Sequence, residues 1–335
     1  MENYNFYENK KKDPKFELDP KMQLPYIEPG EGYVPSEALI QAVNVAIMLQ
    51  KPLLLTGAPG TGKSDLAYHI ANHFGWGEVE HFATRTDSVS TDLLYRYDSL
   101  AHFHKVNIDK ACELTANEIE ASFIKYQALG QAICDSIGYN KDKVARRRVV
   151  LIDEIDKAPR DLPNDILTTI ERMTFEVPEL KTANNTNSSF YKKVGDEALK
   201  PVVILTSNSE KTLPEAFLRR CVFFHIEMPD EKQLVEILLT KKRVLPDLTE
   251  DQRRGFVKLF TTIAGLVQGK KPATHELILW VWWMQKHGFT PDDIYKYDSK
   301  KGNETLLSSV SILTKETDDW RLVTEAIKSR KILNK

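Results

Sequence analysis

The stretch LLLTGAPGTGKSDLAYHIA, residues Leu53–Ala71, places a glycine-rich turn between an apolar run and a helical pattern. Its central part, Gly57–Ser64, fits the P-loop pattern G-x-x-x-x-G-K-S/T in the strand–turn–helix context that this motif needs. Glycines allow backbone N–H groups to turn inward, and the N-terminus of the following helix adds partial positive charge. We therefore expect a phosphate-binding loop made of Gly57, Ala58, Pro59, Gly60, Thr61, Gly62, Lys63, Ser64 and Asp65.

A second apolar run, RRRVVLIDEID at Arg146–Asp156, is typical of a buried parallel strand that ends in acids. Ligands of a parallel sheet gather at the carboxyl ends of its strands, so Asp153 and Glu154 are expected to face the same pocket as the P-loop. We expect Lys63 to reach the β- and γ-phosphates of a nucleotide, and Ser64 and Asp153 to bind Mg²⁺. Glu154 is expected to orient and polarise the attacking water.

Two polar features follow further along the chain. Asn208 ends the apolar run PVVILTSN, Pro201–Asn208, where its amide could hydrogen-bond the water and the γ-phosphate; a strand-terminating turn is the alternative. The segment LPEAFLRRC, Leu213–Cys221, offers Arg219 and Arg220 just before another strand. A guanidinium that reaches the γ-phosphate of a neighbouring subunit would neutralise charge in the transition state. Either arginine could fill this role, and a solvated or salt-bridged surface residue is the alternative.

The P-loop, LIDEID, LTSN and LPEAFLRRC, in this order and at these intervals, resemble an AAA+ ATPase. More narrowly, KPLLLTGAPGTGKS, TDLLYRYDSL, YQALGQAI, DEIDKAPRDLPNDIL and KKPATHELILW resemble the MoxR family. The resemblance implies an α/β P-loop NTPase fold, with helices on both faces of a parallel sheet, followed by a small all-α lid. It also implies ATP and Mg²⁺ as cofactors, a homo-oligomeric ring, usually a hexamer, and a partner protein such as one with a von Willebrand factor A domain.

One stretch departs from the MoxR pattern. Many members carry a sensor-2 arginine at the start of a lid helix, where this chain reads PATHEL. His275 lies near the expected arginine, and Lys270 and Lys271 lie just upstream. We assign Lys271 to the nucleotide, because a lysine can supply the positive charge; weak coupling of the lid to the nucleotide is the alternative.

Patterning along the chain predicts an extended arm at 1–32, a nucleotide-binding domain at 33–229, and a helical lid domain with a tail at 230–335. By the resemblance, the nucleotide-binding domain carries a helical insertion at about 86–145 and a hairpin insertion at about 172–200.

Local patterns add three predictions. The run SEALIQAVNVAIMLQ predicts a helix with Ser36 as its N-cap. The capping-box pattern TANE, Thr115–Glu118, predicts a helix that runs to about Tyr126. Trp280 and Trp283 are three residues apart on one helical pattern, which favours packing in the core of the lid over stacking on nucleic acid.

Composition narrows the choice of function. The 335 residues carry a net charge of −2, so the protein as a whole has no electrostatic attraction for nucleic acid or for an anionic membrane surface. No apolar run approaches the roughly 20 residues that span a bilayer, and the three scattered cysteines are typical of a reducing compartment. These features predict a cytoplasmic protein, and the resemblance to AAA+ and MoxR proteins implies an ATPase that remodels a partner protein. A nucleic-acid-directed motor or loader, or a nucleotide-gated component of a defence or signalling complex, is the alternative.

Overall fold

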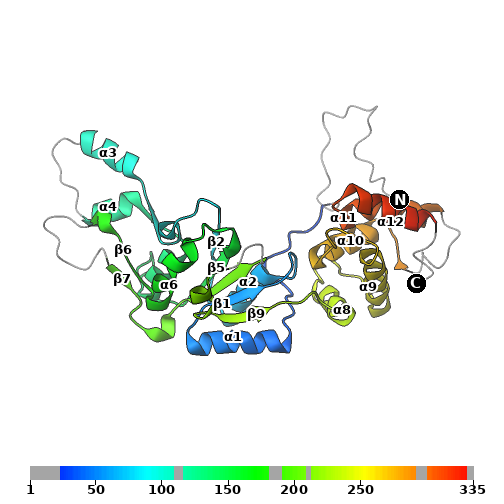
Figure 1. Ribbon diagram of the computed structural model, residues 1–335, viewed down its shortest axis with the longest axis horizontal. Helices are drawn as coiled ribbons and strands as arrows, with labels where there is room; N and C mark the ends of the chain where they lie inside the picture. Colours follow the sequence, from blue (N-terminus) through cyan, green and yellow to red (C-terminus); the bar gives the residue numbers. More distant parts are fainter. Residues whose placement is uncertain (1–22, 109–115, 181–190, 209–212, 292–299, 330–335) are drawn as a thin grey trace. The chain divides into compact units, whose positions relative to one another are not determined.

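The computed structural model describes residues 23–108, 116–180, 191–208, 213–291 and 300–329 (Figure 1). The chain divides into two compact units. The first comprises Glu28–Thr240 and Ala273–His275, and the second comprises the rest. The sequence places the boundary near Pro229, but the division falls after Thr240, because the helix α8 (Glu231–Thr240) belongs to the first unit. The Thr240 hydroxyl donates to the Gly32 carbonyl at 2.7 Å and fixes the end of this helix there.

A five-stranded parallel sheet forms the centre of the first unit, in the order β2-β5-β8-β1-β9. Its strands are β1 (Leu53–Thr56), β2 (Glu80–Ala83), β5 (Val149–Asp153), β8 (Val202–Ser207) and β9 (Val222–His225). The three central strands are buried along nearly their whole length, as expected for a sheet covered on both faces. This confirms the predicted α/β class.

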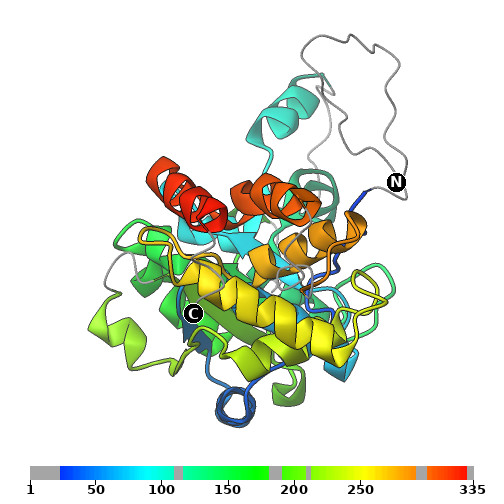
Figure 2. The same cartoon turned by 90° about the vertical axis from the view of Figure 1, so that its right-hand side faces the viewer.

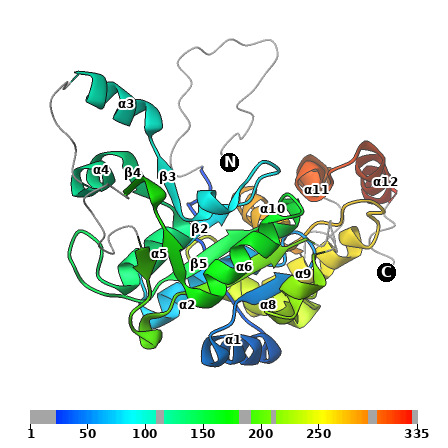
Figure 3. The ribbon, with the colours of Figure 1, turned by 60° about the vertical axis from the view of Figure 1, so that its left-hand side comes forward.

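Helices cover both faces of this sheet because neighbouring strand residues point to opposite sides. Leu53 and Leu55 pack in one apolar cluster with α1 and α2, whereas Leu54 packs in another with α5 and α6. The layers are visible in Figure 3. The covering helices are α1 (Glu37–Leu49), α2 (Lys63–Phe74), α5 (Ala128–Ser136), α6 (Leu162–Arg172) and the short α7 (Glu215–Leu218). Ser36 Oγ accepts from the Leu39 N–H at 3.2 Å, which confirms the predicted N-cap of α1.

Two insertions interrupt the sheet unit. The first contains β3 (Tyr95–Tyr97), α3 (Ser99–Ile108), α4 (Ala116–Phe123) and β4 (Ile124–Tyr126); the second contains β6 (Thr174–Glu176) and β7 (Tyr191–Lys193). Short 3₁₀ turns lie at Ser90–Leu93, Ile155–Lys157, Pro178–Leu180 and Glu197–Leu199.

The prediction that the helix after TANE runs to about Tyr126 is wrong at its C-terminal end. Helix α4 ends at Phe123, and the next three residues pair antiparallel with β3, with Tyr126 opposite Tyr95. Pairing of aromatic residues across two strands overrides the helical pattern here. Thr115, the first residue of the expected capping box, lies outside the described residues.

A buried ion pair joins the two insertions. Glu120 of α4 and Lys192 of β7 lie 3.0 Å apart, and their side chains are only 6% and 5% exposed. The hydroxyls of Tyr126 and Tyr139 donate to the two carboxylate oxygens of Glu120, the latter at 2.7 Å. The Lys192 ammonium also lies 3.7 Å from the centre of the Tyr139 ring. Each charge is therefore compensated, and the insertions are fixed to one another.

Lys192→Met is expected to lower the free energy of unfolding by about 3 kcal/mol, because it leaves the Glu120 carboxylate buried without its cation. The matched control is Arg254→Met, which breaks an exposed ion pair with Glu250 and should cost less than about 1 kcal/mol. Urea unfolding followed by circular dichroism measures both. Equal midpoints for the two variants would show that the ion pair does not hold the insertions together.

The second unit is helical, and its helices come to the front in yellow to red in Figure 2. They are α9 (Glu250–Ala264), most of α10 (Thr274–Lys286), α11 (Lys300–Leu313) and α12 (Thr317–Lys328). Trp280 is fully buried, donates to Ser309 Oγ at 2.8 Å and meets the Phe256 ring edge-to-face, which confirms that it packs in the core of this unit. Trp283 is half-buried against the ring of His287. Across the described part of the chain, no helix combines the length and apolarity needed to span a membrane.

Candidate nucleotide-binding site

The glycine-rich loop follows β1 and leads into α2, in the strand–turn–helix arrangement that the sequence predicts. Gly57, Gly60 and Gly62 all have positive φ angles, of 147°, 78° and 83°. A side chain on Gly57 would also place its Cβ 2.4 Å from the Ile226 carbonyl oxygen. Only glycine satisfies both demands, so the sequence of the loop follows from its conformation.

Lys63 directs its ammonium group back into this loop. Its side chain is 7% exposed, and Nζ donates to the carbonyl oxygens of Gly57 and Ala58, both at 2.9 Å. Burial lowers the pKa of Lys63, and the nearby carboxylates of Asp153, Asp156 and Glu154 oppose that shift. A cation held inside a loop at a helix N-terminus suits an anionic ligand such as a polyphosphate.

Ser64 and Asp153 meet beside this lysine, although they are 89 residues apart in sequence. Ser64 Oγ donates to Asp153 Oδ1 at 2.8 Å, Thr206 Oγ1 donates to the same oxygen, and His81 Nε2 lies 3.7 Å from Oδ2. Burial tends to raise the pKa of Asp153, but its hydrogen-bond donors outweigh burial and lower the pKa to about 2. A hydroxyl beside an ionised carboxylate fits Mg²⁺, which prefers oxygen ligands.

Glu154 turns sharply away from β5. Its backbone adopts the left-handed conformation, with φ 55° and ψ 49°, and its N–H donates to Thr206 Oγ1 at 2.9 Å. The carboxylate then accepts from Asn208 Nδ2 at 3.2 Å and from Lys157 Nζ at 2.6 Å. Positive φ is uncommon for a residue other than glycine, and such strain clusters at functional sites. The structure thus places Glu154 and Asn208, predicted separately from the sequence, in direct contact.

Contacting residues of this site that the sequence does not predict include Thr206, Lys157 and His81. Thr206 bonds both acids that end β5, and the parallel register explains this: Leu205 lies opposite Ile152, which sets Thr206 beside Asp153. A polar residue inside the apolar run VVILTS is a signal that could have revealed it. The sequence offers no comparable signal for Lys157 or for His81 on β2.

Asp65 and the residues before α1 lie at the other side of the loop. Asp65 is exposed, and its Oδ1 accepts from the Gly30 N–H at 3.4 Å. A Cβ on Gly62 would lie 2.8 Å from the Tyr33 ring. The last residues of the predicted arm therefore pack on the first turn of α2 and belong to the sheet unit.

Arg219 and Arg220 lie away from this constellation. They precede β9, whose first residue Val222 is opposite Leu53, whereas the P-loop follows the other end of β1 at Thr56. With a rise of about 3.3 Å per strand residue, the arginine backbone and the P-loop lie at opposite ends of the sheet. Arg219 pairs with Glu215 on the surface, with 76% of its side chain exposed.

Arg220 is less exposed than its neighbour. It pairs with Glu171 of α6 at 2.8 Å and donates to the Ala216 carbonyl at 3.3 Å. Lys270 and Lys271 belong to the second unit, whereas His275, near the start of α10, belongs to the first; all three residues are exposed. The assignment of Lys271 to sensor 2 stays a prediction.

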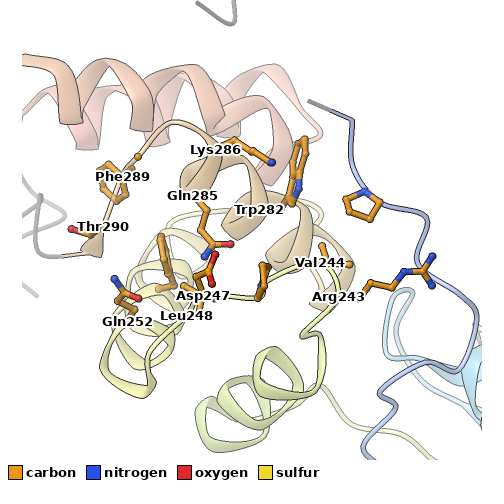
Figure 4. Close-up of a pocket in the computed structure, with 14 residues that line it drawn as sticks. Arg243, Val244, Asp247, Leu248, Gln252, Trp282, Gln285, Lys286, Phe289 and Thr290 are labelled. Carbon is orange, nitrogen blue, oxygen red and sulfur yellow. The ribbon is translucent and has the colours of Figure 1, made fainter. Parts of the chain in front are cut away.

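The helical unit contains a cavity of its own, of about 440 Å³ (Figure 4). Aromatic and aliphatic side chains line it together with a few polar ones, among them Val244, Phe256, Trp282, Lys286 and Phe289. All of its lining residues belong to the second unit, and none comes from the P-loop or from the end of β5. This cavity is distinct from the site described above.

Comparison with known proteins identifies the family of this chain. A family model described as AAA domain (dynein-related subfamily) matches residues 52–221, about half of the chain. A search of the curated proteins finds no match to this chain. Two similar solved structures are variants of RuvB from Thermotoga maritima, each 13% identical. The first alignment spans 85% of this chain and 69% of the RuvB chain, with a TM-score of 0.41. The second spans 84% of this chain and 69% of the RuvB chain, with a TM-score of 0.44. The chain belongs to the dynein-related subfamily of AAA domains.

Proposed function

We propose that this chain is an Mg²⁺-dependent ATPase that works as a homo-oligomeric ring and remodels a partner protein. One observation carries the ATPase proposal: Ser64 of α2, Asp153 and Glu154 at the end of β5, and Asn208 after β8 meet beside the buried ammonium of Lys63. A phosphate cradle, an oxygen-rich cation site and a carboxylate that can accept a proton are the parts that nucleotide hydrolysis requires.

Each residue has a role in this proposal. Lys63 and the loop N–H groups bind the phosphates, and Ser64 and Asp153 would hold Mg²⁺. When bound, the ion neutralises charge that develops on the phosphates. Glu154 accepts a proton from water while the water oxygen bonds to the γ-phosphorus and the bond to the leaving ADP oxygen breaks. Asn208 orients Glu154 and the water without adding charge.

The position of the arginines supports a ring. Arg219 and Arg220 lie at the opposite end of the sheet from their own P-loop, so they can reach a γ-phosphate only in a second copy of the chain. The nucleotide site is then completed between subunits. A hexamer, as is usual for the MoxR family, is the assembly that we propose.

The MoxR resemblance supports a protein as the partner, such as one with a von Willebrand factor A domain. The net charge of −2 gives no general attraction for nucleic acid. The two described free cysteines, Cys134 and Cys221, fit the reducing cytoplasm that we propose as the location.

Lys63→Ala is expected to weaken ATP binding about tenfold to a hundredfold, because it removes charge-assisted bonds to the phosphates. Lys51→Ala is the matched control, since Lys51 is exposed and precedes β1. Binding of a fluorescent ATP analogue and release of phosphate, with Mg²⁺ or with a chelator, measure the two steps. A native protein that binds ATP but releases no phosphate with Mg²⁺ present, at any protein concentration, would contradict the ATPase proposal. Stimulation by DNA instead of by a protein would contradict the proposed partner class.

A further inference from the structure

The first insertion presents a small two-stranded ribbon, β3–β4, with two different faces. Tyr95 pairs with Tyr126 and Tyr97 pairs with Ile124, and these four side chains point toward the core. Between them, Arg96 pairs with Lys125 on the opposite face. Figure 3 shows the ribbon beside α4 and α5, with α3 leaving it and standing away from the parallel sheet.

The outer face of this ribbon consists of two like charges directly opposite each other. Arg96 and Lys125 are both exposed. Their backbones are held at cross-strand distance by the antiparallel register, an arrangement that is unfavourable for two cations. Within the described ranges, neither side chain has an acidic partner at ion-pair distance. We call these two residues the cation face.

The cation face cannot relax by separating its strands, because the inner face of the ribbon is firmly anchored. Tyr95 is 8% exposed, stacks near Phe175 and donates to Glu179 at 2.9 Å. Tyr126 donates to the buried carboxylate of Glu120, which is paired with Lys192. The backbones that carry the two positive side chains are thus held side by side on a ribbon that both insertions support.

We propose that the cation face binds an acidic segment of a partner protein, whose carboxylates bridge Arg96 and Lys125. Charge complementarity is the first argument: an anion between the two cations removes their repulsion and is held by both. This inference rests on the proposed function in one respect, since it names a surface for the partner, but the binding step does not depend on ATP hydrolysis.

Exposed apolar groups on α3, the element that follows β3 in the chain, favour a protein over a nucleic acid. Leu100 and Phe103 lie three residues apart on α3, which begins two residues after β3, and each is 66% exposed. A leucine offers no flat face on which a base can stack, but it can pack on an apolar side chain of a peptide. A segment that mixes acidic and apolar residues can place carboxylates on the cation face and pack its apolar side chains on exposed apolar surface of α3.

The test uses the full chain and a fluorescein-labelled peptide in which glutamate alternates with leucine and phenylalanine. A labelled single-stranded oligodeoxynucleotide of equal length is the competing probe. Fluorescence anisotropy is measured for the native protein, Arg96→Glu and Lys125→Glu. The matched control is Lys232→Glu, at an exposed lysine on α8, which changes the net charge by the same amount.

Each single reversal at the cation face is expected to weaken peptide binding by about tenfold or more, and the control by less than about twofold. Affinity of the native protein should fall as salt is raised. The thermal midpoint provides an independent readout: each reversal places opposite charges across the ribbon, so the midpoint should stay equal or rise while binding falls.

Three results would overturn the inference. They are equal peptide affinity for the native protein and both reversals, an equal loss for Lys232→Glu, and tighter binding of the oligonucleotide than of the peptide. Glu154→Gln is expected to lose ATP hydrolysis and to bind the peptide as the native protein does. The peptide assay therefore tests this inference independently of the ATPase proposal.

Discussion

Glu154→Gln should bind ATP with native affinity and hydrolyse it about 10²–10⁴-fold more slowly, the factor that a positioned general base contributes. The amide keeps the size of the side chain and one oxygen that can accept from Asn208 or from Lys157. It cannot take a proton from water at neutral pH. Binding is preserved because the phosphate-binding loop and the Ser64–Asp153 pair are unchanged.

Two measurements separate binding from chemistry in this variant. A fluorescent ATP analogue reports affinity, and phosphate release in single-turnover conditions reports the chemical step. Glu197→Gln is the matched control, because Glu197 is an exposed carboxylate in a short 3₁₀ turn away from the site. Hydrolysis by Glu154→Gln at the native rate would show that another group activates the water.

The sequence predicts the parts of this site that are local in the chain. The P-loop and the acids that end β5 each follow an apolar strand, and the carboxyl ends of parallel strands meet at one edge. That topology is enough to bring Ser64 to Asp153 and Asn208 to Glu154. Both pairs belong to adjoining elements of the sheet unit.

The sequence does not predict contacts that depend on the conformation of a single turn or on the packing of the insertions. The Lys157–Glu154 ion pair accompanies the left-handed backbone conformation of Glu154. No pattern in the sequence predicts that conformation. The Glu120–Lys192 pair joins two insertions whose packing is set by tertiary burial. Strand pairing of residues 124–126 with β3 likewise ends α4 at Phe123, before the end that the helical pattern predicts.

Replacement of both Arg219 and Arg220 by alanine should lower ATP hydrolysis in the assembled protein about 10³-fold, at the lower end of the range for arginine fingers. ATP binding should change little, because the parallel register places both residues at the opposite end of the sheet from their own P-loop. Arg172→Ala is the matched control, at an exposed arginine on α6. The single variants then show which of the two acts, since Arg219 has its surface pair with Glu215 and Arg220 is tied to Glu171.

Action between subunits has a consequence that action within one chain lacks. Lys63→Ala keeps its arginines but has a defective P-loop, whereas the double arginine variant keeps its P-loop. Mixed in one ring, a P-loop of the second variant can lie against the arginines of the first, so two inactive proteins should together regain phosphate release. A mixture that assembles, by light scattering, and stays inactive would contradict catalysis in trans. Full activity of the double arginine variant alone would contradict any catalytic role for the pair. In that case Glu154 and Asn208 would be sufficient for hydrolysis without either arginine.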